Sequence, residues 1–442
     1  MIESLGAGFG TVTAGILMLY GGYATLRSKG LPIRGFFAMF RQIKTSSSTG
    51  RTVSPFRAFA TSLGGTIGVG NLTGVALALS LGGAGAVFWM WVSAFLCMTV
   101  KYFEVYLALK YQPKGEIHYG FAPMQYIKKA TEQKGFAALF ALLGVFSALI
   151  MGSMIQTNAA ANAALDSFSC PVWVTGIIFT LGTMVFLSGG IRRVTGALEK
   201  AVPILGGSFL FLGILVISLR FYRILPAFQR IFSEAFSVSS AAGGFLGSGV
   251  TLAFRHGVGN GLFSHEAGLG SAGLAHGACG ANPETQGLWG MFEVFADSIV
   301  ISTVSALMIL TTDSVGATGG VLAAAERVLG GIGEGIISVC LILFAFLSVL
   351  SWSCYGETCF VWICGKKSAI AFRILFLATP ILAIVLPETS LWSLAEMING
   401  SMMILNLTGL LGCSEELKSL AKIDFRAKKS PPAVTEGDSG NT

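Results

Sequence analysis

Eleven apolar runs, each long enough to cross a bilayer, constrain the fold of this chain more than any other feature. They span residues 8–26, 56–82, 85–111, 136–162, 171–190, 198–220, 232–263, 288–312, 334–364, 368–387 and 391–412. A transmembrane helix needs about 17–25 such residues, and helices satisfy all their backbone polar groups within lipid. The pattern therefore predicts an all-α polytopic membrane protein with about 11 transmembrane helices.

The composition supports a bilayer as the solvent. Charged residues make up only 12% of the 442 residues, whereas a soluble domain carries about 25%. The net charge of +7 resides in the loops between apolar runs, so it indicates orientation and not nucleic-acid binding. The lipid bilayer is thus the expected surrounding partner.

The loop charges predict a topology. Basic residues concentrate in the segments 27–57, 110–134, 191–200 and 365–373 and in the tail 413–442. Because cytoplasmic loops are rich in Lys and Arg, these segments predict a multi-pass inner-membrane protein with its N-terminus outside and its C-terminus cytoplasmic. The loop 220–231 contains three arginines and is assigned outside because its neighbours require it. A short interfacial helix is expected at residues 318–330.

A glycine pattern occurs twice, at residues 64–70 and 243–249, and reads GGxxGxG in both places. Each copy lies within an apolar run, where so much glycine favours an unwound helix. Five spans begin at each copy, so the two units have opposite orientation in the membrane. We expect an extra N-terminal helix (1–30), two inverted five-helix repeats (54–222 and 230–412) and a cytoplasmic tail (413–442). The alternative is that these glycines serve only helix packing.

A broken helix in each repeat predicts a solute site at the membrane midplane. The N–H groups at the start of a half-helix attract a carboxylate, and the carbonyls at the end of the other half attract sodium or an ammonium group. A zwitterion can be held there without burying an unpaired charge. This indicates a secondary transporter that works by alternating access.

The remaining chemistry argues against an enzyme. Most of the eight cysteines lie in apolar runs, as small buried residues do. The four histidines show no metal-ligand spacing, and the pair His265-Glu266 has no nucleophile beside it. We therefore expect no cofactor and no catalytic site.

Several motifs resemble the sodium:alanine (alanine/glycine:cation) symporter family over nearly the whole chain. They are residues 68–76, 81–91, 261–271 and 286–295, then Asp297, Trp352 and residues 355–357. The resemblance implies a leucine-transporter-type fold and sodium-driven symport of alanine or glycine. It also implies a pocket formed by the two breaks and by the fourth and ninth spans. We also expect the chain to function as a monomer.

The pocket that the resemblance implies has named residues. The expected substrate-binding residues are Thr66, Gly68, Gly70, Asn71, Gln156, Gly244, Gly247, Ser248 and Trp352. The candidate sodium ligands are Gly65, Thr66 and Ser348. Gln156 would hydrogen-bond the substrate, and Trp352 would close a small apolar pocket over a methyl side chain.

The chain departs from the family pattern at four places. Leu347-Ser348 replaces the usual Ser-Thr, His265 replaces Asn, Asn260 replaces Arg, and Phe121-Ala122 replaces Gly-Gly. The lost hydroxyl leaves the coupling ion open. The alternative reading is therefore a proton-coupled or uncoupled carrier of another small zwitterionic solute.

Ionisable residues within or at the ends of spans form a second group of candidates. They are Lys101, Glu104, Arg255, Glu293, Asp297 and Glu357. Lys101 shares a helix face with Glu104, and Glu293 shares one with Asp297, because helical neighbours are three or four residues apart. The group is interpreted as a structural or gating network, with a proton relay through Asp297 as the alternative. An ion channel or a membrane-embedded enzyme fits less well, because neither a symmetric filter nor a catalytic constellation is evident.

Overall fold

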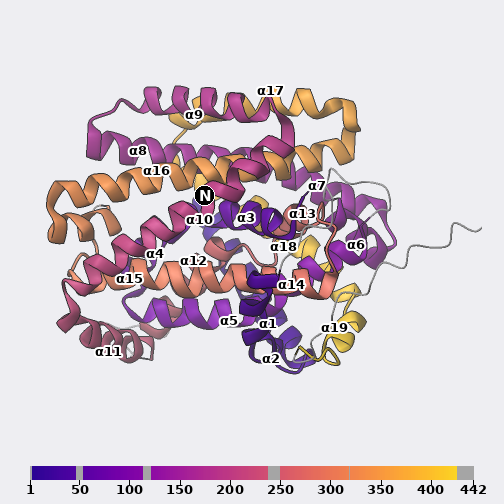
Figure 1. The fold of residues 1–442 in the computed structure, drawn as a ribbon, viewed down its shortest axis with the longest axis horizontal. Coiled ribbons are helices and arrows are strands. Elements are labelled where there is room, and N and C mark those ends of the chain that lie inside the picture. The colour runs from indigo at the N-terminus through magenta and orange to yellow at the C-terminus, as the bar shows by residue number, and fades with distance from the viewer. Residues whose placement is uncertain (1, 46–52, 113–120, 237–248, 318, 426–442) are drawn as a thin grey trace, which may run out of the picture.

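The computed structural model is all helical in the residues that it describes, which are 2–425 except 46–52, 113–120, 237–248 and 318 (Figure 1). The helices of the N-terminal half are α1 (Ile2–Arg27), α2 (Leu31–Thr45), α3 (Pro55–Thr66), η1 (Val69–Asn71), α4 (Thr73–Gly82), α5 (Gly85–Lys110), α6 (Ala122–Thr131), α7 (Lys134–Leu149), η2 (Ile150–Ile155), α8 (Gln156–Phe168), α9 (Val172–Leu187) and α10 (Gly190–Ser218).

The described residues of the C-terminal half are helical as well. Its helices are η3 (Phe221–Arg223), α11 (Ile224–Ala235), α12 (Gly249–His265), α13 (Ser271–His276), α14 (Pro283–Val294), η4 (Phe295–Ile301), α15 (Ser302–Thr311), α16 (Val321–Cys364), η5 (Lys366–Ser368), α17 (Ala369–Val385), α18 (Glu388–Gly412) and α19 (Glu415–Leu420).

The predicted spans are found as helices. Eight helices among the described residues are long and apolar enough to cross a membrane, and the pair Pro55–Thr66 and Val69–Gly82, bent by 59°, makes a ninth. The shorter apolar helix α9 corresponds to the fifth predicted run, and α12 begins directly after the undescribed residues 237–248. The polytopic all-α prediction is therefore confirmed.

Three boundaries differ from the sequence prediction. The loops expected at 27–57 and 220–231 contain the helices α2 and α11. Both are amphipathic, so a search for continuous apolar runs passes over them. The interfacial helix expected at 318–330 is the first part of α16, which is kinked at Gly330 (φ 67°).

Helices at corresponding places in the two predicted repeats pack on each other. α5 packs against α14, α7 and α8 against α16, and α9 against α17, while the extra helix α1 lies along α18. In Figure 1, α8, α9, α16 and α17 run together across the top of the view. Glycine permits close approach, as in soluble and membrane helices alike: a Cβ at Gly290 of α14 would lie 3.0 Å from the carbonyl oxygen of Lys101 on α5.

Local signals start the two helices that lead into the core. Ser54 caps α3 by accepting a hydrogen bond from the Arg57 amide at 3.1 Å, and Asn282 caps α14 by accepting one from the Glu284 amide at 2.8 Å. A proline follows each cap, as is common at the first helical position. These caps fix where α3 and α14 enter the bundle.

Candidate functional site

The first break separates α3 from α4 at residues 67–72. α3 ends at Thr66, Gly68 is extended (φ −139°, ψ −147°), and the short turn η1 leads into α4. The carbonyls at the end of α3 and the amides at the start of α4 lack intrahelical partners in such a geometry. This is the pair of free helix ends that the first glycine motif predicted.

The four glycines of that motif divide into two roles. Gly64 and Gly65 are still helical and admit α16: a Cβ at Gly64 would lie 2.9 Å from Ser351 Oγ, and one at Gly65 would lie 2.9 Å from Tyr355 Oη. Only Gly68 and Gly70 lie within the break. The packing interpretation therefore holds for the first two glycines, and the unwinding interpretation holds for the last two.

A second break occurs at residues 266–270, between α12 and α13. Glu266, Gly268 and Gly270 have positive φ values of 51°, 87° and 85°. The predicted second break, with Gly244, Gly247 and Ser248, lies largely in residues 237–248, outside the described residues. The break at 266–270 was not predicted from the sequence, although two glycines, Gly268 and Gly270, occur there.

The first break lies against the end of α12 at Gly70. A Cβ at Gly70 would lie 3.1 Å from Phe263 Cδ1 and 3.5 Å from Ser264 Cα. The neighbouring Asn71 side chain donates to Asp297 Oδ1 at 2.9 Å, and Ser264 Oγ donates to Asp297 Oδ2 at 2.7 Å. Residues far apart in sequence thus join the first break, the end of α12 and η4.

Gln156 lies at the first break, as predicted. Its Oε1 accepts a hydrogen bond from the Val69 amide at 3.3 Å, and a Cβ at Gly68 would lie 2.7 Å from the same oxygen. The π-helical turn η2 ends at Ile155 and sets Gln156 at the start of α8. Because Gly68 has no side chain, the Gln156 amide can lie directly against the backbone of the first break.

Trp352 lies at the second break. It is fully buried, and its Nε1 donates to Glu266 Oε1 at 3.3 Å. Gly152 makes room for the indole, because a Cβ there would come within 2.2 Å of Trp352 Cβ. The fourth and ninth predicted spans thus each contribute a side chain to a different break.

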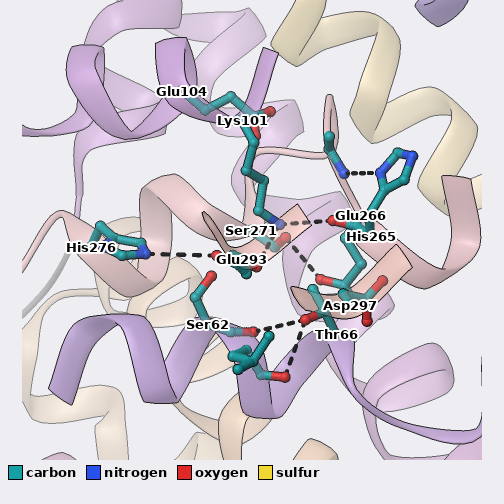
Figure 2. Close-up of polar contacts among 12 residues, drawn as sticks. Ser62, Thr66, Lys101, Glu104, His265, Glu266, Ser271, His276, Glu293 and Asp297 are labelled. Atoms are coloured by element: carbon teal, nitrogen blue, oxygen red, sulfur yellow. Dashed lines mark hydrogen bonds and ion pairs between the residues drawn. The ribbon is translucent and has the colours of Figure 1, made fainter. Parts of the chain in front are cut away.

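Two of the candidate sodium ligands lie together. Ser348 Oγ donates to the Gly65 carbonyl oxygen at 3.1 Å. The hydroxyl of Thr66, labelled in Figure 2, donates back to the Leu63 carbonyl at 3.1 Å. All of these groups are neutral oxygen donors, which suit a hard cation.

A buried frame of charged side chains surrounds the second break. Lys101 Nζ lies 2.8 Å from Glu293 Oε1 and donates to the His265 carbonyl at 2.9 Å (Figure 2). Glu104 accepts a hydrogen bond from the Gly270 amide at 3.0 Å. The remaining contacts are Asn406 Nδ2 to the Gly268 carbonyl at 2.8 Å and Ser271 Oγ to Glu266 Oε2 at 2.8 Å. Of the charged residues predicted to form a network, Lys101 and Glu293 pair with each other and Glu104 joins them at this break, whereas Glu357 pairs with Arg373 at 2.7 Å. The donors and acceptors at the second break replace the missing helical bonds.

A cavity of about 290 Å³ opens between α1, α12 and α18. Glu266 and Phe263 line it beside the second break, and Arg255 and Glu396 line it as well. None of the predicted substrate-binding residues that the structure describes is in its lining. Those residues are buried, and one of them, Trp352, donates a hydrogen bond to Glu266 of the cavity lining. Among the described residues, no group of three or more His, Cys, Asp or Glu side chains is arranged to hold a metal ion.

A family match identifies the class of protein to which this chain belongs. The pattern of the sodium:alanine symporter family matches residues 3–434. The chain belongs to this family. The sodium/alanine symporter AgcS of Methanococcus maripaludis is 37% identical over 86% of this chain and 85% of its own length. The probable sodium/glutamine symporter GlnT of Bacillus subtilis is 32% identical over 94% of this chain and 88% of its own.

A solved structure supports the fold. The crystal structure of MhsT in complex with L-phenylalanine has a TM-score of 0.57, with 13% identity over 86% of this chain and 99% of that one. At this identity the likeness concerns the fold alone, which is the leucine-transporter type. As a member of the sodium:alanine symporter family, the chain is a sodium-coupled amino acid symporter and not an enzyme.

Proposed function

We propose that this symporter carries alanine or glycine together with sodium, and that the substrate binds where the first break meets the end of α12, beside the second break. The observation that carries this proposal is the contact of Gly70 with Phe263 and Ser264, with Gln156 at the adjacent Gly68. Two free helix ends, an amide side chain and a buried carboxylate are then within one region. This set suits an amino acid zwitterion.

Each end of the zwitterion has a partner in this arrangement. The amide groups at the start of α4, where the helix dipole is positive, attract the substrate carboxylate. The ammonium group faces the carbonyls at the end of α3 and the carboxylate of Glu266. The ring of Phe263 packs against the ring of Trp392 at an angle of 45°, with centroids 4.8 Å apart, and Phe263 lies between Gly70 and the cavity.

The packing at the breaks favours a small substrate side chain. One added carbon at Gly68 would lie 2.7 Å from Gln156, and one at Gly70 would lie 3.1 Å from Phe263. Trp352 is fully buried on the other side. The methyl group of alanine or the hydrogen of glycine fits such surroundings better than the longer side chain of glutamine, the amino acid for which the GlnT relative is named.

The cation site belongs to the same proposal. We assign one sodium ion to the Gly65 carbonyl and the hydroxyls of Ser348 and Thr66. Support comes from the 3.1 Å contact between Ser348 Oγ and the Gly65 carbonyl, since a sodium ion takes the same oxygen atoms as ligands. Leu347 contributes no hydroxyl, so Ser348 is the side chain of that pair that binds the ion.

The topology completes the proposal. We assign 54–222 and 230–412 to two inverted repeats, with α12 and α13 as the broken helix of the second. The mutual packing of α5 with α14 and of α9 with α17 supports this division. The chain lies in the inner membrane with its N-terminus outside, and it works as a monomer.

Uptake of labelled alanine into proteoliposomes tests the function. We expect accumulation under an inward sodium gradient, competition by excess glycine and weak competition by glutamine. Gly70→Val and Gln156→Ala should abolish uptake while the protein still inserts, whereas Gly207→Ala should not, because a Cβ at Gly207 meets nothing within 4 Å.

The other outcomes separate the alternatives. Accumulation under a proton gradient alone would replace sodium with protons as the driving ion. Normal uptake by both Gly70→Val and Gln156→Ala would refute the site. If glutamine competes with alanine and glycine does not, the preferred substrate would be glutamine, as in the name of the GlnT relative.

A further inference from the structure

Residues 413–425, the tail segment, lie across one end of the helical bundle. The segment follows α18 directly and contains α19 (Figure 1). Leu417 and Leu420 of α19 are fully buried, and Ile423 and Phe425 beyond it pack against the core as partly buried side chains. Burial of apolar side chains therefore fixes the tail segment to the bundle.

The tail segment contacts the ends of α1 and α5. Glu415 lies 3.5 Å from Arg27, the last residue of α1. Glu416 accepts a hydrogen bond from Tyr111 Oη at 3.0 Å and pairs with Lys110, the last residue of α5. Exposed ion pairs add little stability individually, but these contacts define the position of the segment at the end of the bundle.

Two arginines of α2 bind the backbone of the tail segment. Arg34 donates to the Ser28 carbonyl at 3.0 Å and to the Ile423 carbonyl at 2.6 Å. Arg41 donates to the Phe425 carbonyl at 2.6 Å. The two arginines are seven residues apart and so share one face of the helix. α2 is thus attached to the tail segment by charge-assisted hydrogen bonds.

An aromatic cluster connects α2 with α3. The ring of Phe40 on α2 lies 5.6 Å from that of Phe292 on α14, and Phe292 lies 5.6 Å from Phe59 on α3. Phe36 of α2 likewise lies 5.6 Å from Phe295. α3 ends at the first break. The position of α2 therefore acts on the half-helix before that break through packed side chains.

The cavity and the tail segment lie toward opposite ends of the bundle. On α1 the cavity is lined by residues from Gly10 to Ala14, whereas the tail contact is at Arg27, about 20 Å further along the helix. On α18 the lining begins at Trp392, whereas the tail segment begins after Gly412. A carrier that works by alternating access opens each end in turn. The tail segment covers the end that this cavity does not approach.

We propose that the tail segment is a strap that restrains the opening of its end of the carrier. It holds α2 through Arg34 and Arg41, and α2 in turn supports the packing of Phe292 on α3. Opening that moves α3 away from α14 breaks this packing, and the strap adds to its free-energy cost. The inference goes beyond the proposed substrate and ion and depends on neither.

A native cysteine reports on the position of α3. Cys279 is buried, and it packs with Val53 and with Ala58 of α3. Movement of α3 away from α13 would expose its thiol to a small maleimide. Cys364 is exposed and Cys359 is fully buried in α16. Labelling of Cys364 therefore calibrates the reagent, and labelling of Cys359 reveals unfolding.

The test compares full-length variants by the rate of Cys279 labelling, with the labelled cysteines identified by mass spectrometry. Arg41→Gln should label Cys279 about fivefold faster than wild type, since a hydrogen bond of about 1 kcal/mol changes an equilibrium by that factor. Phe425→Ala, which removes the ring beside Tyr102, should also speed labelling. Lys418→Gln is the matched control, because Lys418 pairs with Glu415 inside α19, and it should match wild type.

Transport supplies the second readout. Exchange of labelled alanine across proteoliposomes should be about twofold faster for Arg41→Gln, because opening limits turnover in many proteins of this kind. Equal Cys279 labelling in wild type, Arg41→Gln and Phe425→Ala would overturn the strap. So would faster labelling of Cys359 together with Cys279, which means unfolding, or faster Cys279 labelling with unchanged alanine exchange. Absence of alanine exchange in the wild type would refute the proposed substrate, whereas the Cys279 comparison would still decide whether the strap exists.

Discussion

The two breaks occupy corresponding positions in the proposed inverted repeats, yet they are held open by different means. The first break has glycine at residues 68 and 70, and it is held by the neutral amide of Gln156 and the hydroxyl of Ser348. The second has three positive φ values and is held by Lys101, Glu104 and Asn406.

The difference indicates that the two breaks have different roles. At the second break, charged side chains satisfy the backbone groups that the helix leaves free, so this half is fixed before any ligand arrives. At the first break, the ends of α3 and α4 keep groups available for a substrate and a cation. We infer that the second break is the rigid frame and that the first break is the part that responds to binding.

Breaking the charged frame should have the largest effect. Lys101→Met leaves Glu293 buried without its cation and the His265 carbonyl without its donor, so we expect a loss of about 3–5 kcal/mol of stability. The folded fraction, measured by size-exclusion chromatography in detergent, should fall sharply. Lys101→Met with Glu293→Gln should recover much of it, because the uncompensated charge is removed.

The matched control is the exposed pair of Lys418 and Glu415, which lie 2.6 Å apart. Lys418→Met should change stability by less than about 1 kcal/mol. If Lys101→Met were equally mild, the second break would not depend on its charges, and the contrast between the two breaks would fail.

The backbone of the second break gives the next effect. Gly270 has a φ of 85°, and an added Cβ would lie 2.8 Å from Phe140 Cζ. Gly270→Ala should therefore cost more than the roughly 1–2 kcal/mol of left-handed strain alone. Gly316→Ala is the comparison, since Gly316 has a φ of 75° and nothing within 4 Å of a Cβ. The midpoint temperature of thermal unfolding should be clearly lower for Gly270→Ala than for Gly316→Ala. Equal midpoint temperatures would mean that Phe140 moves away from the added methyl group at little cost.

The sequence predicted much of this fold and one of the two breaks. Apolar runs identify spans directly, because lipid imposes a minimum length on them. The first glycine motif was visible, as was Gln156. The repeated GGxxGxG motif predicts the second break at residues 243–249, whereas the break at 266–270 has only Gly268 and Gly270 to mark it.

Other features could not be read from the order of residues. Lys101 and Glu293 are 192 positions apart in sequence, and their 2.8 Å contact follows only from the packing of α5 on α14. The network of Asn71, Ser264 and Asp297 likewise depends on three elements meeting. Lys101, Glu293 and Asp297 were candidates from the sequence because charges within membranes are rare, and Asn71 was a candidate from the family motif. Ser264 was not, and the order of residues does not show which of them meet.

The first break should respond in transport more than in stability. In Gly68→Ala, the new methyl group would meet Gln156 Oε1 at 2.7 Å and push that flexible side chain away. The buried Val69 amide then loses its acceptor, at a cost of about 1–3 kcal/mol. We expect alanine uptake to fall about tenfold with normal expression, by comparison with Gly207→Ala. Loss of folded protein instead of uptake would show that this break is as structural as the second.

The smallest effect should come from the contact between Trp352 of α16 and Glu266 of the second break. Trp352→Phe removes the Nε1 donor that lies 3.3 Å from Glu266 Oε1 but still fills the space beside Gly152. Side-chain hydrogen bonds within membranes average about 0.6 kcal/mol, so uptake at low alanine should fall only about threefold. A double-mutant cycle with Glu266→Gln isolates the pair. A coupling energy near zero would mean that α16 does not act on the second break through this bond, and that Trp352 serves the site by its shape alone.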